Sequence, residues 1–276
     1  MRYRYEENRY EIPVPEMKQG ERYRLALLAD LHNCGFEGVI GLLEAAKPDM
    51  VCCAGDMVNC PGFPRIPAWH EALSFYGELA KRFPVCAVTG NHEERWKASG
   101  NEALRRQYED FCGQLSDMKI ELLDNRTITC RAGGARLNIS GLALGSREYH
   151  RGERGKKNLE DGALERRLGK KPEGFTVLLA HTPNAIEDYA AWGADLILSG
   201  HLHGGIVRLF GRGLIGSGFQ LFPPYTRGKY SVGSATMLLS AGLGEHFLPL
   251  RVAQAAEKIV ISVDGKEELI EWVRLI

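Results

Sequence analysis

Five short apolar runs in this chain are each followed, within a few residues, by side chains that can bind a metal ion. The pairs are Tyr23–Ala29 with Asp30 and His32, Met50–Ala54 with Asp56 and Asn59, Val85–Thr89 with Asn91 and His92, Thr176–Ala180 with His181, and Asp195–Ser199 with His201 and His203. Short apolar runs bounded by glycine are typical of buried strands. Because the carboxyl ends of neighbouring parallel strands meet at one edge of a sheet, we expect these polar side chains to converge.

Helical stretches separate the first strands. Phe36–Lys47 has apolar residues at helical spacing and ends before Pro48, and Ala68–Lys81 is the next predicted helix. Further strand-like runs follow at Ile120–Leu123, Ile128–Cys130, Arg136–Leu142, Met237–Ser240 and Lys258–Val263. This order predicts an α/β (α+β) fold of mixed sheets with helices on the outside.

The charges of the chain balance, with 35 Lys and Arg residues against 35 Asp and Glu residues among 276. This balance argues against nucleic-acid binding, which requires a basic stripe. No apolar run reaches the length of about 18 residues that a membrane-spanning helix needs. Seven cysteines without a CxxC pair, and a start without a signal-peptide pattern, favour a reducing, cytoplasmic setting.

Two segments allow more than one interpretation. Arg147–Lys171 is rich in charged residues and glycine, and we interpret it as an exposed insertion with a short helix around Gly162–Leu168. Arg2–Tyr10 alternates in a way that fits an edge strand but also fits peripheral contact with a membrane surface; we favour the strand.

The residue types after the strands indicate a site for two metal ions. Carboxylate, imidazole and amide oxygen together suit borderline divalent metals such as Mn, Fe, Co or Zn. A carboxylate can bridge two ions, and such a pair stabilises a phosphoryl displacement and lowers the pKa of a bound water toward about 7. The pattern therefore predicts hydrolysis of a phosphate ester without a Ser or Cys nucleophile.

In sequence order, DLH at 30–32, GDMVN at 55–59, GNHE at 90–93, the single His181 and GHLH at 200–203 resemble the calcineurin-like metallophosphoesterase superfamily. A tail with Gly204-Gly205, Gly242-Leu243-Gly244 and Leu248–Arg251 is similar to that of the small bacterial single-domain branch. The resemblance implies a sandwich of two mixed sheets flanked by helices, in a four-layer arrangement, and a single domain over 1–276.

The resemblance also implies a role for each matched residue. Asp30, His32 and His203 would bind one metal; Asn91, His181 and His201 would bind the other; and Asp56 would bridge them. His92 would face the substrate and either stabilise charge on the phosphoryl group or protonate the leaving oxygen. We expect two divalent ions, among Mn, Fe, Zn and Co, and favour Mn.

Asn59 departs from the family pattern, because many relatives have an Asp there that pairs with the catalytic His. An amide can orient His92 but supplies no negative charge, so we hypothesise that His92 is a neutral hydrogen-bond donor. Such a donor favours substrates with a good leaving group. His150, His246 and Arg251 are further candidates for contact with substrate.

We therefore expect a metal-dependent phosphohydrolase acting on a small-molecule or lipid-linked phosphate ester, with phosphodiesters and pyrophosphates favoured. The alternative is a metal-binding scaffold of the same fold without catalysis, and Asn59 is the feature that supports it.

Overall fold

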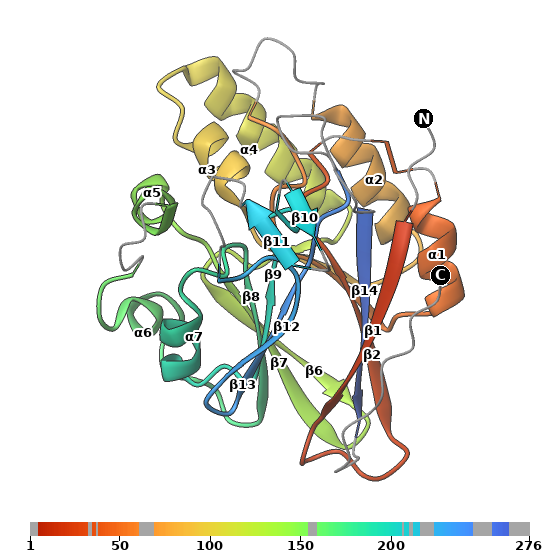
Figure 1. The fold of residues 1–276 in the computed structure, drawn as a ribbon. Coiled ribbons are helices and arrows are strands. Elements are labelled where there is room, and N and C mark those ends of the chain that lie inside the picture. Colours follow the sequence, from red (N-terminus) through yellow and green to blue (C-terminus); the bar gives the residue numbers. More distant parts are fainter. Residues whose placement is uncertain are drawn as a thin grey trace.

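The computed structural model describes residues 5–32, 35–36, 38–60, 69–153, 159–205, 207–209, 212–215, 224–244 and 256–264. Within these residues the chain forms two six-stranded sheets and a separate two-stranded hairpin, with helices on the outer side of each large sheet (Figure 1). The expected pair of mixed sheets with outer helices is thus confirmed.

Three strands of the first sheet lead into the first three predicted metal-binding motifs, at 30–32, 55–59 and 90–93. Its strands, in spatial order, are β1 (Tyr5–Pro13), β14 (Ala256–Asp264), β2 (Arg22–Leu28), β3 (Met50–Cys53), β4 (Val85–Ala87) and β5 (Glu121–Leu122). The run from β2 to β5 is parallel, and β14 is antiparallel to β2 but parallel to β1. Strand β1 lies at the edge of this sheet, as the alternation around Tyr10 predicts.

The second sheet contributes the loops that carry His181, His201 and His203. In spatial order it contains β12 (Gly228–Val232), β13 (Ala235–Leu239), β9 (Leu196–Ser199), β8 (Phe175–Ala180), β7 (Ala135–Leu142) and β6 (Arg126–Ala132). Strands β13, β9, β8 and β7 are parallel, while both edge strands run antiparallel to their neighbours. The hairpin pairs β10 (Val207–Leu209) with β11 (Arg212–Ile215).

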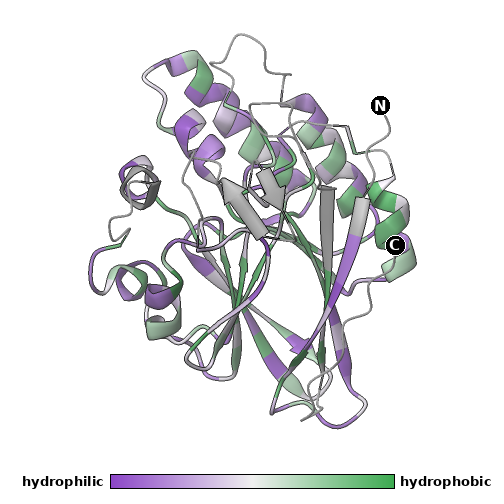
Figure 2. Ribbon diagram, in the orientation of Figure 1, coloured by the Kyte–Doolittle hydropathy of each residue, from purple (hydrophilic) through white to green (hydrophobic). Residues whose placement is uncertain are grey.

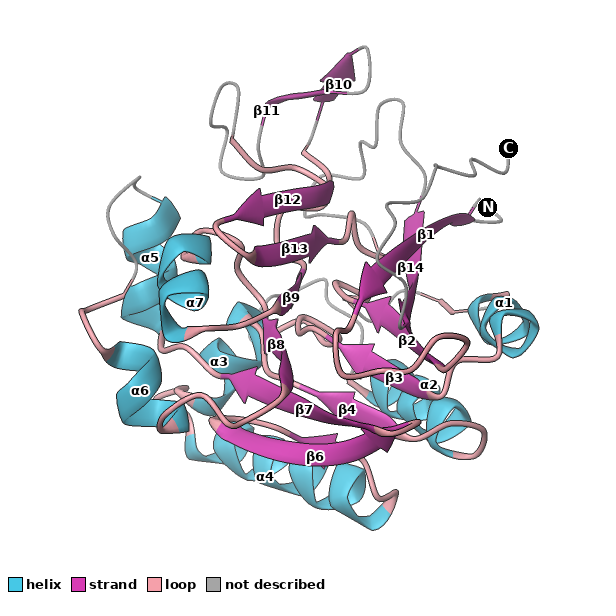
Figure 3. Ribbon diagram, turned by 90° about the horizontal axis from the view of Figure 1, so that it is seen from below, coloured by secondary structure: helices cyan, strands magenta, loops and turns pink. Residues whose placement is uncertain are grey.

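Two groups of helices cover the outer faces (Figure 3). The first sheet carries α1 (Val39–Ala46), α2 (His70–Ala80), α3 (Asn91–Lys97) and α4 (Glu102–Asp117). The second carries α5 (Ser146–Glu153), α6 (Ala163–Leu168) and α7 (Ile186–Trp192). Helices α1, α2 and α6 match the predicted ones to within a few residues, whereas α3, α4, α5 and α7 are not among the predicted helices.

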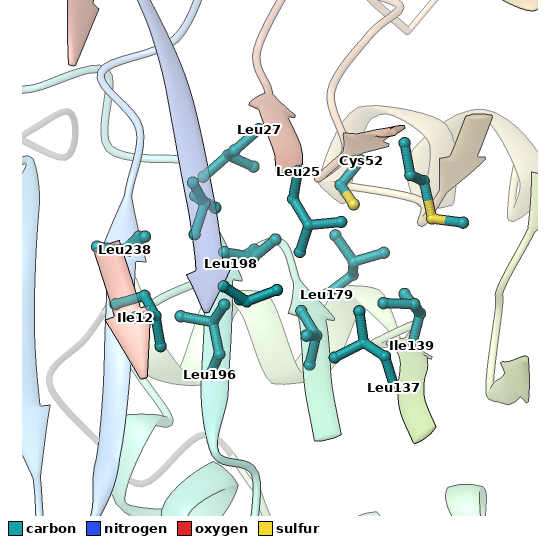
Figure 4. Packing of buried hydrophobic residues seen from close by; sticks show 14 of the residues in the cluster. Ile12, Leu25, Leu27, Cys52, Leu137, Ile139, Leu179, Leu196, Leu198 and Leu238 are labelled. Atoms are coloured by element: carbon teal, nitrogen blue, oxygen red, sulfur yellow. The ribbon is translucent and has the colours of Figure 1, made fainter. Parts of the chain in front are cut away.

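The strand sequences are apolar at nearly every position because both faces of each sheet are buried. Along β2, Leu25 and Leu27 point into the core between the sheets, whereas Ala26 and Leu28 pack under the helices of the first sheet. Figure 4 shows the inter-sheet core, where Leu25 and Leu27 face Leu179 and Leu198 of the second sheet. The hydropathy colouring in Figure 2 shows apolar strands inside and polar helix faces outside.

The charged segment is less exposed than predicted. Besides α6, it contains most of α5, and Tyr149, Leu159 and Leu164 are buried in the apolar cluster beneath α7. A few apolar side chains at suitable spacing therefore anchor a segment whose composition is otherwise polar. Among the residues that the structure describes, no helix has the length and apolar character needed to cross a membrane.

Candidate metal centre

The polar residues after the strands meet at one end of the two sheets. Asp30 follows β2, Asp56 follows β3, and Asn91 begins the helix after β4, while His181 and His201 follow β8 and β9. Main-chain hydrogen bonds connect these loops across the sheets, for example from the N–H of Leu243, after β13, to the carbonyl of Ala29, at 3.0 Å. Residues up to 171 positions apart are in direct contact there.

A first cluster contains Asp30, His32 and His203, all buried, with one ligand-type atom of each within 4.8 Å of the others. The Nε2 atoms of His32 and His203 are 3.0 Å apart, and Nε2 of His203 is 3.5 Å from Oδ1 of Asp30. One carboxylate and two imidazoles that converge in this way form a donor set suited to a borderline divalent ion.

A second cluster contains Asp56, His181 and His201. Nε2 of His181 lies 3.1 Å from Oδ2 of Asp56 and 3.1 Å from Oδ1 of Asn91. The other ring nitrogen of His181, Nδ1, lies 2.7 Å from the carbonyl of Ala54 and donates to it. This hydrogen bond fixes the tautomer, so the lone pair of the neutral ring is on Nε2, facing the cluster.

Asp56 joins the two clusters. Its carboxylate is also grouped with His32 and His92, whose ligand-type nitrogens lie within the same 4.8 Å limit. Oδ1 of Asp56 accepts a hydrogen bond of 2.8 Å from the main-chain N–H of His92, which orients the carboxylate. Its Oδ2 lies 4.0 Å from Nε2 of His32 in the first cluster and 3.1 Å from Nε2 of His181 in the second.

The backbone at these residues is unusual. Eight described residues other than glycine have positive φ, and five of them are candidate ligands: Asp30, His32, Asp56, His201 and His203, with φ between 49° and 78°. For residues with a Cβ this conformation costs free energy and persists only where surrounding structure holds it. Its concentration at the ligands indicates that the loops are shaped to converge these side chains.

The structure shows why the glycine-rich tail has glycine at position 242. Gly242 has φ of 78°, and a Cβ there would lie 2.8 Å from Cβ of Asp30. The glycine thus allows the loop after β13 to pass directly behind a candidate ligand.

The pKa values of the buried groups are strongly perturbed, which is common at functional sites. Burial lowers the pKa of His32 to about 3, so its ring is neutral and can bind a metal. Burial acts in the same direction on His181, but the charges of Asp56 and Asp30, together with the hydrogen bonds to Asp56 and Ala54, outweigh it and raise the pKa of His181 to about 9. Burial and the Asp56 charge raise the pKa of Glu93 above its usual range.

Glu93 has a supporting role that its position in the sequence does not reveal. Its buried carboxylate accepts hydrogen bonds from the main-chain N–H groups of Asp56, Val58 and Gly90, at 2.9–3.0 Å. It therefore ties the loop after β3 to the start of α3. The GNHE sequence contains this residue, but nothing in the sequence reveals the direction of its side chain.

The hydrogen bonds of Asn59 go to His32 and not, as expected, to His92. Its Oδ1 lies 2.9 Å from Nδ1 of His32, and its Nδ2 donates to the main-chain carbonyl of His32 at 3.1 Å. The ring of His92 is oriented instead by the main-chain N–H of Cys60, which donates to Nδ1 at 3.3 Å. In a neutral His92 ring the proton is then on Nε2, which lies 4.0 Å from Oδ2 of Asp56.

Tyr149 also lies at the site and is not among the predicted site residues. Its buried ring lies 6.1 Å from that of His181 and 5.8 Å from that of His201, between ring centroids. The sequence signal that could have found it is a lone aromatic residue inside a charged segment that starts just after a strand.

The three candidates for substrate contact cannot be located relative to the site, because their side chains lie outside the part of the chain that the structure describes. His150 belongs to α5, but its side chain is not described, and His246 and Arg251 lie outside the described residues.

The model of the calcineurin-like phosphoesterases matches residues 23–205, and this chain belongs to that family. It is 27% identical over 241 residues to an uncharacterized metallophosphoesterase, YkuE, of Bacillus subtilis (strain 168), covering 82% of this chain and 71% of YkuE. It is 24% identical over 269 residues to an uncharacterized metallophosphoesterase of Aquifex aeolicus (strain VF5), covering 94% of this chain and 91% of the relative. It spans only 61% of a metallophosphoesterase of Helicobacter pylori (strain ATCC 700392 / 26695).

Solved structures with a similar arrangement include phosphopantetheinyl hydrolase (PptH) from Mycobacterium tuberculosis, with a TM-score of 0.48 and 15% identity, covering 83% of this chain and 91% of that one. TT1561 of Thermus thermophilus has a TM-score of 0.49 and 9% identity, covering 81% and 89%. With both scores below 0.5, these likenesses carry no functional argument.

Proposed function

We propose that this chain is a phosphohydrolase that uses two divalent metal ions, with phosphodiesters or pyrophosphates as the favoured substrates. The observation that carries the proposal is the convergence of seven ligand-type side chains at adjoining strand ends, five of them on left-handed backbone. Family membership supports the hydrolase class.

In this proposal Asp30, His32 and His203 hold one ion, Asn91, His181 and His201 hold the other, and Asp56 contacts both. Carboxylate, imidazole and amide donors suit Mn, Fe, Zn or Co, and we favour Mn. Two such ions would supply Lewis-acid stabilisation of the phosphoryl oxygens and an activated water as nucleophile.

The side chain of His92 is the part of the chain proposed to act on the substrate directly. It is about one fifth exposed, whereas the side chains of His32 and His203 are nearly inaccessible. Burial lowers its pKa, so the neutral ring is favoured and offers Nε2–H as a hydrogen-bond donor toward the cluster. A neutral donor stabilises charge on a phosphoryl or leaving oxygen without full proton transfer, which suits esters and pyrophosphates with good leaving groups.

A cytoplasmic setting is part of the proposal. The cysteines described in the structure, Cys52, Cys53, Cys60, Cys86, Cys112 and Cys130, are all free thiols, which is the usual state in a reducing compartment.

The test is the Asp56→Asn variant, assayed with bis(p-nitrophenyl) phosphate and added Mn²⁺. Turnover is expected to fall below detection while the circular dichroism spectrum is unchanged. Asp49→Asn is the matched control, because the Asp49 carboxylate accepts from the N–H of Arg24 at the opposite end of β2. Wild-type protein that binds two ions but hydrolyses no phosphate ester would support the non-catalytic scaffold instead.

A further inference from the structure

Tyr149 lies on α5, one of the helices outside the second sheet (Figure 1). Helix α5 contacts α3, the helix that begins with Asn91 and His92. It is fixed in place by Glu148, whose carboxylate accepts from the N–H of Gly145 at 2.8 Å and from Arg167 of α6 at 2.9 Å. The position of Tyr149 is therefore set by anchored structure on both sides.

The ring of Tyr149 packs against two candidate ligands of the second cluster. It meets the ring of His181 edge-on and that of His201 at a tilt of 46°. The residue is 4% exposed, so its phenol group is buried beside the two imidazoles.

The hydroxyl of Tyr149 is buried and makes no hydrogen bond within the described part of the chain. A buried phenol normally has a partner, and the neighbouring Tyr189 of the same apolar cluster donates to the carbonyl of Thr182 at 3.0 Å. Since the described residues give Tyr149 no acceptor, a bound molecule is the natural source of one.

An ordinary phenol is protonated at neutral pH, so the hydroxyl of Tyr149 is available as a hydrogen-bond donor. A phenol that stays protonated beside His181 and His201 can serve a negatively charged oxygen held at the second cluster.

We propose that Tyr149 is a substrate-positioning residue whose hydroxyl donates a hydrogen bond to a non-bridging phosphate oxygen of the bound substrate. The inference rests on the proposed function, since it places the phosphate group at the cluster of Asp56, His181 and His201.

The test compares Tyr149→Phe with wild type in Mn²⁺-loaded protein, using inorganic phosphate as the probe. Calorimetric titration is expected to show binding of phosphate weakened roughly 10-fold to 100-fold, because a hydrogen bond to a charged group is lost. Metal content, measured by mass spectrometry, is expected to be unchanged. The ring remains in the variant, so packing against the imidazoles is preserved.

Tyr189→Phe is the matched control, because it removes a buried hydroxyl from the same cluster. Loss of its bond to Thr182 is expected to lower the Tm without changing phosphate affinity. Phosphate affinity unchanged in Tyr149→Phe, or loss of metal from that variant, would overturn the inference.

Because the titration needs no turnover, the two proposals can fail separately. Wild type that binds phosphate more tightly than Tyr149→Phe, yet hydrolyses no ester, would remove the proposed function and leave the phosphate contact. Wild type that hydrolyses esters, with phosphate affinity equal in both proteins, would remove the contact alone.

Discussion

Substitution of Gly55 by alanine tests whether the close approach of the loops holds the metal centre together. Gly55 has φ of 91°, and a Cβ there would lie 2.7 Å from the main-chain N of Gly90 and 2.8 Å from Nδ1 of His181. The left-handed backbone costs a residue with a Cβ roughly 1–2 kcal/mol, and overpacking against main chain adds roughly 1–3 kcal/mol. Gly55→Ala is therefore expected to lower the free energy of unfolding by about 2–5 kcal/mol.

The effect is measurable by thermal or denaturant unfolding. For 276 residues, an unfolding entropy of about 2.1 cal/mol/K per residue gives about 0.6 kcal/mol/K, so the Tm is expected to fall by roughly 3–9 °C. Because the added methyl group pushes against His181, metal affinity is expected to fall as well. The variant and wild type are compared at the same metal concentration.

Gly41→Ala provides the same chemical change where the structure has room. Gly41 lies within α1, and a Cβ there would meet nothing within 4 Å. Alanine is the better helix former, so this variant is expected to gain about 0.5–1 kcal/mol. Equal stability of Gly55→Ala and wild type, or equal shifts in the two variants, would refute the argument from close approach.

Three further predictions concern the metals and His92. Asn59→Ala is expected to weaken metal binding by roughly 10-fold to 100-fold, because the hydrogen bond to His32 is lost. Asn59→Asp keeps an acceptor for His32 and is expected to keep the metal affinity. If Asn59→Ala instead shifts the pH–rate profile with unchanged metal affinity, Asn59 acts on His92 and not on His32. Protein with each metal ion present at about 100 times its Kd is compared with protein treated with EDTA. The Tm is expected to be lower by roughly 5 °C for each ion removed, with the far-ultraviolet circular dichroism spectrum unchanged; a loss of helix signal would contradict this. His92→Asn is expected to reduce kcat for bis(p-nitrophenyl) phosphate roughly 100-fold to 1000-fold with metal content unchanged, and a rate near that of wild type would exclude a direct role.

The strands and their sheet arrangement could be predicted because the relevant information is local. Runs such as Tyr23–Ala29 are apolar at almost every position, since odd and even residues enter two different cores. A residue directly after such a run lies at the end of the strand wherever the neighbouring strands are, so Asp30 and His181 could be placed without knowing the loops. Parallel pairing then brings them to one edge.

The contacts of Asn59 could not be predicted in this way. The chain turns through a left-handed residue at Asp56, with φ of 51°, and the loop beyond it carries Asn59 to His32, 27 positions earlier in the chain. Sequence distance favours neither His32 nor His92 as the partner, because the choice depends on the path of the loop. Tyr149 could not be predicted for a different reason. The segment around it is rich in charged residues, so its composition indicates exposure and hides a single buried aromatic residue.

The hydrogen bonds between the loops bear on how the centre responds to loss of metal. The main-chain N–H of Asp30 donates to Gly55, that of His32 donates to Asp56, and that of Gly244 donates to Asp30, at 2.7–3.1 Å. These bonds join main-chain groups of three different loops and involve no ligand atom of any side chain. The left-handed backbone at the ligands is therefore held by the scaffold, so the ligand atoms are already close together before an ion binds. Binding energy is then available to hold the ions rather than to order the loops, which is why chelation is expected to lower stability without unfolding the centre.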